Sequence, residues 1–301
     1  METSEERAQN DRVKGLFVDA VAYLVACGIG GLFFFHIDHL LVAAAVFTAT
    51  ATLILFLVSA FFSDVSVYDP YWSVAPPVMM VLVLLKYRIW NVNAAIVLIL
   101  IAVWSVRLTA NWLYTYRGLG HEDWRYRMYR EKCSPVLFQL ISFVGLHFVP
   151  TLVVYAGMIS GFLAVQESAF SPWSVIGIAV MVGAVGLEYV SDHAIHGFLR
   201  EHAGEHKTCA VSVWNYSRHP NYLGEMAFWT GLYLFFVAVR PDAWYMGLGF
   251  LSIIGLFLVV SIPMMERHNT ERRADYPEYK RTTSMLLLLP KKGRKDQKTV
   301  K

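Results

Sequence analysis

The densest group of chemically capable side chains is the nine-residue run SRHPNYLGE at residues 217–225. Pro220 has no backbone N–H and fits the first turn of a helix, so we expect an apolar helix to begin there. Asn221 and Glu225 are four residues apart, which places an amide and a carboxylate on one helix face. A carboxylate just inside an apolar helix is costly to bury, so this pair is a candidate site. The alternative is a Glu that merely reaches back to the membrane surface.

Two other polar clusters interrupt the apolar pattern earlier in the chain. Tyr68 and Asp69 precede a proline, and an Asp in that position is also an ordinary helix cap. Trp104, Arg107 and Asn111 are spaced by three and four residues, which puts them on one helix face. Arg107 lies too deep in an apolar run to be a loop cation, so it requires an acidic partner or an anionic ligand. A purely structural ion pair is the alternative.

A fourth set of polar residues, Glu188, Asp192, His196 and Arg200, recurs every four positions. On a helix this spacing forms a polar stripe about 18 Å long on one face. Ordinary i,i+4 ion pairs on a solvated helix would give the same pattern. Because this helix begins as an apolar span, we expect the stripe to face a bundle interior or an aqueous groove.

The C-terminal arginines allow two interpretations, a plain interfacial helix or a set of phosphate-binding cations that includes Arg267. Several histidines lie in the second half of the chain, but none has the spacing of a metal-binding motif, so no metal site is predicted. The net charge of +3 does not indicate a nucleic-acid partner, because membrane topology explains where the basic residues lie.

These residues must be positioned by membrane helices. The 301 residues are 56% hydrophobic and only 16% charged, whereas soluble domains have about 25% charged residues. We therefore predict an all-α integral membrane protein with seven or eight transmembrane helices. The apolar runs are 15–36, 39–62, 71–87, 92–114, 136–166, 173–198, 222–239 and 243–265. The fifth contains Pro150, for which we expect a kink or tilt. Basic residues concentrate on one side of these spans, which predicts cytoplasmic N- and C-termini.

The sequence WNYSRHPNYLGE at 214–225 resembles the steroid 5-alpha-reductase superfamily, specifically its bacterial branch of largely uncharacterised membrane proteins. The resemblance covers roughly residues 65–290 and includes RLTANW at 107–112, EDWRY at 122–126 and YPEY at 276–279. The Arg-His-Pro-x-Tyr-x-Gly pattern is also shared with isoprenylcysteine methyltransferases and related lipid methyltransferases. It therefore identifies a superfamily rather than a reaction.

The resemblance implies an enzyme that binds NADPH in a cytoplasm-facing cavity among its later helices. It implies that Asn221 and Glu225 contact the nicotinamide amide, and that Asp192 matches a nucleotide-binding acid. Arg200 and Arg218 are expected to hold ribose and phosphates. The full set of cofactor-binding candidates is Asn111, Glu188, Asp192, Arg200, Arg218, His219, Asn221, Tyr222, Glu225, Arg267 and Tyr276.

The resemblance also implies a reaction, the reduction of a C=C bond conjugated to a carbonyl. Asp69 and Tyr68 match the positions that contact the substrate carbonyl, and a protonated Asp69 would donate to it. Arg107 matches the family, whereas Trp104 replaces a family Tyr and offers an N–H but no phenolic proton. The expected substrate is apolar (steroid-, terpenoid- or lipid-like) and enters from the bilayer.

Two other functions remain open at this point. One is an S-adenosylmethionine-dependent methyltransferase that acts on a lipid or isoprenoid thiol. The other is a non-enzymatic membrane scaffold or transporter whose polar stripe lines a pathway. The expected organisation is a polar cytoplasmic N-terminus at 1–14, two transmembrane helices within 15–62, a reductase-like domain at 63–290 and a basic disordered tail at 291–301 near anionic membrane lipid. The expected location is the bacterial inner membrane.

Overall fold

The computed structural model describes residues 4–291, and within them the secondary structure is helical without strands. Eight described stretches are long and apolar enough to cross a membrane. They are Gln9–His36, Leu40–Phe62, Val65–Tyr87, Val92–Thr115, Pro135–Ala164, Ser174–Glu201, Pro220–Val239 and Pro241–Arg272. Each predicted apolar run overlaps one of them. The predicted polytopic helical membrane bundle is confirmed.

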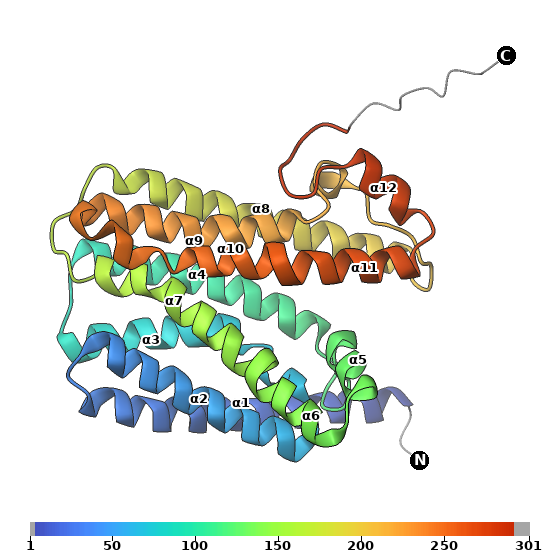
Figure 1. The fold of residues 1–301 in the computed structure, drawn as a ribbon, viewed down its shortest axis with the longest axis horizontal. Helices are drawn as coiled ribbons and strands as arrows, with labels where there is room; N and C mark the ends of the chain where they lie inside the picture. Colours follow the sequence, from blue (N-terminus) through green and yellow to red (C-terminus); the bar gives the residue numbers. More distant parts are fainter. Residues whose placement is uncertain (1–3, 292–301) are drawn as a thin grey trace. The chain divides into compact units, whose positions relative to one another are not determined.

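The described chain forms two compact units, whose helices Figure 1 labels. The first unit runs to Ser171 and also includes Phe236–Gly249. It contains α1 (Ser4–His36), α2 (Leu40–Phe62), η1 (Val65–Tyr68), α3 (Tyr71–Tyr87), α4 (Val92–Thr115), α5 (Trp124–Lys132), α6 (Pro135–Ile141), η2 (Ser142–Phe148), α7 (Val149–Ala164) and η4 (Pro241–Gly247). The second contains α8 (Ser174–Glu201), η3 (Ser212–Asn215), most of α9 (Pro220–Val239), α10 (Phe250–Leu256), η5 (Phe257–Ser261), α11 (Ile262–Arg272) and α12 (Tyr276–Thr282).

The two ends of the chain differ in how far the structure describes them. Helix α1 already begins at Ser4, so the helix extends into the polar segment that we expected to precede the first span. The predicted tail at 291–301 lies outside the described residues except for Lys291.

Helix boundaries follow local capping chemistry. The side chains of Asn91, Asp123 and Ser134 accept hydrogen bonds from backbone N–H groups two or three residues later, which caps α4, α5 and α6. Pro220 is the first residue of α9, as its missing N–H predicts. Local sequence therefore decides where these helices begin.

Two spans contain a π-helical turn, and each turn precedes a proline. The π-helical turn Ser142–Phe148 ends two residues before Pro150, and Phe257–Ser261 ends two residues before Pro263. Proline removes a backbone donor and crowds the preceding turn, so a wider turn at that place relieves the clash. The expected irregularity at Pro150 therefore takes the form of a π turn.

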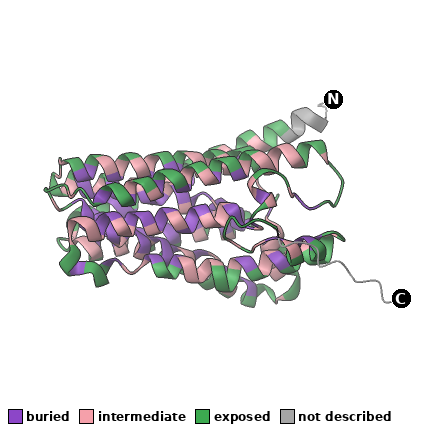
Figure 2. Cartoon of the chain, turned by 90° about the horizontal axis from the view of Figure 1, so that it is seen from above, coloured by how far each residue is buried: buried purple, intermediate pink, exposed green. Residues whose placement is uncertain are grey.

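Large apolar side chains are exposed along the spans. Phe61 is 83% exposed and Val259 is 75% exposed, and Figure 2 shows buried and exposed residues alternating along the same helices. Soluble proteins rarely expose apolar surface on this scale. The exposed faces of these helices are therefore their lipid-facing surface.

Helices α8 and α9 touch at glycines. A Cβ atom on Gly177 would lie 2.7 Å from the carbonyl oxygen of Gly231, and one on Gly224 would lie 3.0 Å from that of Ala184. Small residues at such contacts allow backbones to approach closely within a membrane. This contact holds the beginning of α9, which carries the SRHPNYLGE run, against the polar stripe on α8.

We predict that Gly177→Ala destabilises the protein, because the added methyl group has no room between the two backbones. Overpacking of this kind typically costs about 1–3 kcal/mol. Gly183→Ala on the same helix is the control, since a Cβ there would meet nothing within 4 Å. Thermal unfolding in detergent should show a lower midpoint for Gly177→Ala alone; equal midpoints for the two variants would contradict the contact.

Candidate functional site

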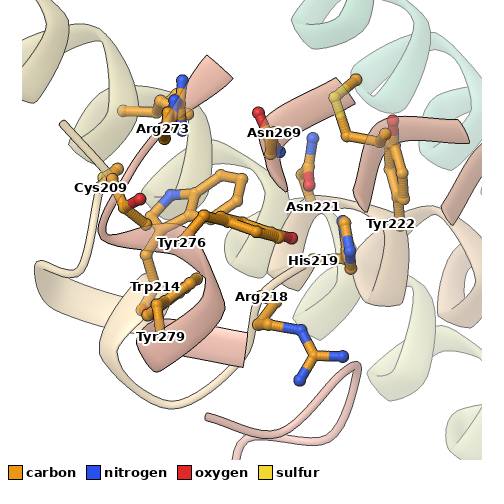
Figure 3. A pocket seen from close by; sticks show the side chains of 13 residues that line it. Cys209, Trp214, Arg218, His219, Asn221, Tyr222, Asn269, Arg273, Tyr276 and Tyr279 are labelled. Carbon is orange, nitrogen blue, oxygen red and sulfur yellow. The ribbon is translucent and has the colours of Figure 1, made fainter. Parts of the chain in front are cut away.

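The second unit contains a cavity of about 170 Å³ beside the beginning of α9 (Figure 3). Its wall is formed by Ile195, Thr208, Cys209, Trp214, Arg218, His219, Asn221, Tyr222, Met265, Asn269, Arg273, Tyr276 and Tyr279. These residues come from α8, the segment leading into α9, the first turn of α9, α11 and α12. Five of the predicted cofactor-binding residues line it: Arg218, His219, Asn221, Tyr222 and Tyr276.

The segment before α9 is held in place by its own hydrogen bonds. The indole N–H of Trp214 donates to the carbonyl oxygen of Ser191 on α8 at 2.9 Å. The hydroxyl oxygen of Ser217 accepts from the backbone N–H of His219 at 3.2 Å. These contacts orient the residues that immediately precede Pro220, so the side chains of the motif reach the cavity from a fixed backbone.

Aromatic rings form part of the cavity wall. The rings of His219 and Tyr222 are stacked, with centroids 5.3 Å apart and an angle of 7° between their planes. Tyr276 and Tyr279 lie on α12, with ring centroids 5.8 Å apart. Stacked and tilted rings at this spacing give flat apolar surfaces against which a planar ligand ring can pack.

The polar side chains of Asn221, Asn269 and Tyr276 converge inside the cavity. Figure 3 shows the hydroxyl of Tyr276 directed toward Asn269, Asn221 and His219. Tyr276 is 2% exposed, and its hydroxyl has no partner at hydrogen-bond distance and angle within the described part of the chain, while the side chain of Asn269 lies close enough to lower its pKa. Leaving such a group unsatisfied costs about 1–3 kcal/mol. A ligand that offers a polar atom to this hydroxyl would recover that energy.

The Tyr276 hydroxyl keeps its proton at neutral pH. Burial raises the pKa of Tyr276 above its usual value, and the nearby Glu266 carboxylate raises it further. The phenol can therefore donate a hydrogen bond into the cavity.

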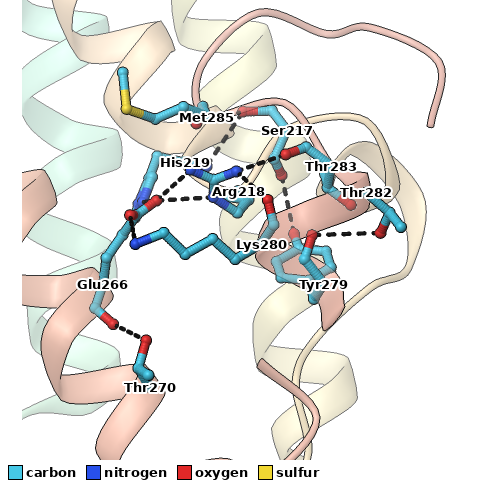
Figure 4. A network of polar contacts seen from close by, with 10 residues as sticks. All are labelled: Ser217, Arg218, His219, Glu266, Thr270, Tyr279, Lys280, Thr282, Thr283 and Met285. Carbon is cyan, nitrogen blue, oxygen red and sulfur yellow. Dashed lines mark hydrogen bonds and ion pairs between the residues drawn. The ribbon is translucent and has the colours of Figure 1, made fainter. Parts of the chain in front are cut away.

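A buried carboxylate ties the cavity walls together (Figure 4). Glu266 on α11 is 7% exposed and lies 2.6 Å from the guanidinium of Arg218 and 2.8 Å from the ammonium of Lys280. The ring Nε2 of His219 lies 3.5 Å from the same carboxylate. Two charge-assisted contacts from different segments offset much of the cost of burying this carboxylate.

The guanidinium of Arg218 makes its hydrogen bonds within the protein. Besides Glu266, its guanidinium donates to the backbone oxygens of Lys280 at 2.8 Å and Thr283 at 2.6 Å. A phosphate could bind Arg218 only by competing with these contacts. The expected contact of Arg218 with a phosphate therefore stays a prediction. In the structure Arg218 links Glu266 on α11 to the backbone of residues 280 and 283.

Residues 275–289 form what we call the closing segment, which packs against the residues before α9. The backbone N–H of Arg218 donates to Ser284 at 2.9 Å, and Ser217 and Ser284 form a bridge. The hydroxyl of Tyr279 donates to the carbonyl oxygens of Trp214 at 2.5 Å and Ser217 at 3.1 Å. The closing segment thus supplies one side of the cavity through α12.

Asp275 fastens the other end of the closing segment. Burial alone would raise the pKa of Asp275, but hydrogen bonds from the hydroxyl and the backbone N–H of Thr208, at 2.6 and 2.9 Å, outweigh it. The pKa of Asp275 therefore lies below its usual value, and the ionised carboxylate favours the folded state.

The predicted residues on α8 and α9 outside the wall fall into two groups. Glu188 is 1% exposed and Glu225 is 6% exposed. Glu225 accepts a hydrogen bond at 3.0 Å from the indole N–H of Trp229. Asp192 is half-buried and Arg200 is exposed. Along the predicted stripe on α8, exposure to solvent therefore increases from the buried carboxylate of Glu188 to the exposed guanidinium of Arg200.

On α11 the predicted cofactor-binding residue Arg267 does not line this cavity. The side chain of Arg267 is 80% exposed and pairs with Glu271 at 2.9 Å, outside the wall. Met265 and Asn269, four residues apart, line the cavity, and Arg273 follows them. Residues four apart share a helix face whereas position 267 points elsewhere, so the i,i+4 spacing was the missed signal.

The other five predicted residues lie in the first unit, where Tyr68 and Asp69 make hydrogen bonds within that unit. The Tyr68 hydroxyl lies 2.5 Å from the hydroxyl of Thr151, which also lies 2.5 Å from that of Thr52. Thr151 donates to the backbone oxygen of His147 at 2.9 Å. Because Thr151 has one proton, Tyr68 and Thr52 must be the donors to it. Tyr68 would have to break this hydrogen bond to donate to a substrate.

Asp69 is not the helix cap that the alternative interpretation expected. Pro70 is the cap residue of α3 and no side chain caps that helix, so the cap interpretation of Asp69 is wrong. The carboxylate accepts a hydrogen bond from the hydroxyl of Tyr126 at 2.5 Å. Asp69 could donate a hydrogen bond to a substrate carbonyl only when its own carboxyl group is protonated.

The predicted arginine face lies on α4. Trp104 is fully buried, and Arg107 and Asn111 are half-buried. Ser105 donates to the backbone oxygen of Ser73 on α3 at 2.6 Å, so this part of α4 is fixed to its neighbour. The three predicted side chains thus share a helix, at the predicted spacing. Among the described residues, no group of three or more His, Cys, Asp or Glu side chains could hold a metal ion.

Comparison with known proteins places most of the chain in one family. A family profile described as a protein of unknown function, DUF1295, matches residues 55–283. An uncharacterised protein of Schizosaccharomyces pombe is 26% identical over 255 residues, which cover 75% of this chain and 72% of the relative. No solved structure matches the chain.

We predict that Glu266→Ala destabilises the second unit strongly, because it leaves Arg218 buried without its acidic partner. Breaking a buried pair in this way costs about 3–5 kcal/mol. Glu271→Ala breaks an exposed pair on the same helix and should cost about 0.2–1 kcal/mol. Thermal unfolding of both variants measures the difference in stability. Similar losses of stability would contradict a buried ion pair between Glu266 and Arg218.

Asp275 gives the closing segment a pH dependence. Because its folded pKa is depressed, its stabilisation is present above its unfolded pKa of about 3.9 and is lost as the pH falls through the folded value. We expect Asp275→Asn and Thr208→Val to lower the unfolding midpoint at pH 7, and the Asp275→Asn deficit to shrink below pH about 4. A deficit of Asp275→Asn that is independent of pH would contradict this assignment.

Proposed function

We propose, from the premise that this chain belongs to the DUF1295 family of proteins of unknown function, that it is a membrane-embedded NADPH-dependent reductase. The proposed reaction reduces a C=C bond conjugated to a carbonyl in an apolar substrate. The observation that carries the proposal is the cavity in which two asparagines and the unsatisfied hydroxyl of Tyr276 converge beside aromatic rings.

The residues of this cavity fit one end of a nicotinamide cofactor. Complete ligand pockets are typically about 300–1,000 Å³, so a cavity of about 170 Å³ suits a single ring with its substituent rather than a whole dinucleotide. The amide groups of Asn221 and Asn269 can each donate and accept, which complements a carboxamide. Tyr222 and His219 offer a flat stacked surface to a planar ring.

The anionic part of the cofactor requires a cation. Arg218 is occupied by Glu266 and by two backbone oxygens, which makes it a positioning residue in this proposal. Arg273 lines the cavity and belongs to the segment that joins α11 to α12. We therefore assign the first phosphate or ribose contact to Arg273, with Asp192 and Arg200 on α8 as further candidates.

NADPH would supply the hydride. The protein must then orient the cofactor, exclude water and stabilise the negative charge that develops on the substrate oxygen. In the proposal Asn221, Asn269 and Tyr276 hold the ring end of the cofactor. Tyr68 and Asp69 stay the residues proposed to polarise the carbonyl, and for this Tyr68 would exchange its hydrogen bond to Thr151 and Asp69 the one from Tyr126.

We extend the proposal to the steroid 5-alpha-reductase superfamily, supported by the motifs at 214–225 and 276–279 and by the position of both at one cavity. Cytoplasmic N- and C-termini are also proposed, supported by the basic residues of the 116–134 segment and of the C-terminal end. A bacterial inner membrane stays a prediction that rests on the family resemblance alone.

The methyltransferase alternative depends on the Arg-His-Pro segment for binding a cofactor carboxylate. Arg218, the arginine of that segment, already pairs with Glu266 at 2.6 Å and is only 9% exposed. A ligand carboxylate would have to displace an internal one that is equally well matched. The same contacts limit the binding of a cofactor phosphate to Arg218, so they do not separate the two functions.

We predict that NADPH stabilises the purified protein in a thermal-shift titration, by about 2.7 kcal/mol at a hundredfold excess over Kd. Asn221→Ala and Tyr276→Phe should weaken NADPH binding, since each removes a polar partner inside the cavity. Arg267 lies outside the wall, so the Arg267→Ala variant should bind NADPH as the unmodified protein does. The same titration with S-adenosylmethionine runs alongside.

The outcomes separate the functions. Stabilisation by S-adenosylmethionine alone would make the chain a methyltransferase, and stabilisation by neither ligand would favour a scaffold or transporter. If NADPH binds, anaerobic NADPH oxidation with a panel of enones and mass analysis of the products identifies the substrate class. Binding without oxidation of any enone would contradict the proposed reaction.

A further inference from the structure

An exposed apolar run lies just beyond the last membrane span. Residues 285–289 have the sequence MLLLL, and the last span ends at Arg272. Leu287, Leu288 and Leu289 are 59%, 44% and 50% exposed, and Met285 is 40% exposed. Four large apolar side chains in five residues are thus exposed on a segment that does not itself cross the membrane.

No other described segment outside the spans carries such a run. The large exposed apolar residues of these segments are otherwise Trp90, Phe170, Trp173, Val211 and Tyr216, with at most two in any one connection. Isolated exposed apolar residues are ordinary on any protein surface. A contiguous row of leucines is not, and it marks an interaction surface.

The backbone of this run is fixed at the place where a span begins. The N–H of Leu289 donates to the carbonyl oxygen of Tyr216 at 3.3 Å, and Ser284 pairs with Ser217. Tyr216 is four residues before Pro220, the first residue of the α9 span. The leucines therefore lie close to where α9 enters the membrane, and the exposed ring of Tyr216 beside them is a residue typical of membrane interfaces.

We propose that residues 285–289 are an interfacial membrane anchor that inserts its leucines at the boundary of headgroups and acyl chains. Apolar side chains at this depth are removed from water while the backbone stays near the polar headgroups. In the sequence the run is followed by Lys291, Lys292, Arg294 and Lys295. Such a basic stretch is attracted to an anionic lipid surface, which adds to the same orientation.

The anchor is continuous with one wall of the cavity. Tyr276 and Tyr279 line the cavity from α12, and the oxygen of Thr283 accepts from Arg218 two residues before the run begins. Membrane attachment at 285–289 would therefore add to the hydrogen bonds that hold α12 against the residues before α9. This inference concerns lipid contact and does not depend on which cofactor the cavity binds.

Depth-dependent fluorescence quenching tests the anchor directly. The probe is bimane on Leu288→Cys, in a background in which Cys27, Cys133 and Cys209 are Ala, reconstituted in nanodiscs of phosphatidylcholine and phosphatidylglycerol. Ala274→Cys, exposed in the same C-terminal region but outside the run, is the matched control. Lipids with a nitroxide near the headgroup should quench position 288 severalfold more than position 274, whereas iodide should quench position 274 more.

Equal accessibility of both positions to iodide, with no quenching by lipid, would overturn the anchor. Protection of position 288 in crude membranes but not in nanodiscs would point to a protein partner and would overturn it as well.

A second measurement tests the link to the cavity wall. In nanodiscs, the triple variant L287S/L288S/L289S should be cut severalfold faster by trypsin at Lys280 and Arg281, because α12 is no longer held at the membrane. Trp173→Ser, which removes an exposed ring from another connection, is the control and should be cut at the normal rate. An unchanged rate in the triple variant would overturn the proposal that the anchor holds α12 in place.

Discussion

The second unit depends on one buried carboxylate. Glu266 comes from α11, Arg218 from the turn before α9 and Lys280 from α12, so a single ion cluster joins three segments that are far apart in the chain. A carboxylate this buried is costly unless it is matched closely, and here each of its oxygens faces a cation. The same three segments, together with α8 and the Thr208–Cys209 connection, form the wall of the cavity. The shape of the candidate site is therefore a consequence of the way this charge is satisfied.

The predicted residues Tyr68 and Asp69 of the first unit have hydroxyl groups as their partners. Tyr68 and Thr52 donate hydrogen bonds to the hydroxyl of Thr151, which donates to the backbone oxygen of His147 in a π-helical turn. Asp69 accepts a hydrogen bond from Tyr126. Backbone and side-chain polar groups in a membrane must find partners within the protein. The candidate catalytic residues thus have structural partners already, and catalysis through them would require an exchange of hydrogen bonds.

Much of this architecture was readable from sequence because it is local. Length and apolarity of the runs predicted the eight spans, and Pro220 predicted the first residue of α9. What the sequence did not reveal is non-local. Arg218 is separated from Glu266 by 48 residues and from Thr283 by 65, and nothing in either neighbourhood indicates the partner. Residues of the motif line the cavity beside α9, but the motif did not predict that its arginine would bind the closing segment.

The proposed function requires that the cavity beside α9 receives the nicotinamide end of a cofactor. An experimental structure of the detergent- or nanodisc-embedded protein with saturating NADPH is the decisive measurement. We expect a planar ring between Asn221, Asn269 and Tyr276, with the Glu266 cluster intact. A dinucleotide bound at another place, or an empty cavity at saturating NADPH, would contradict it.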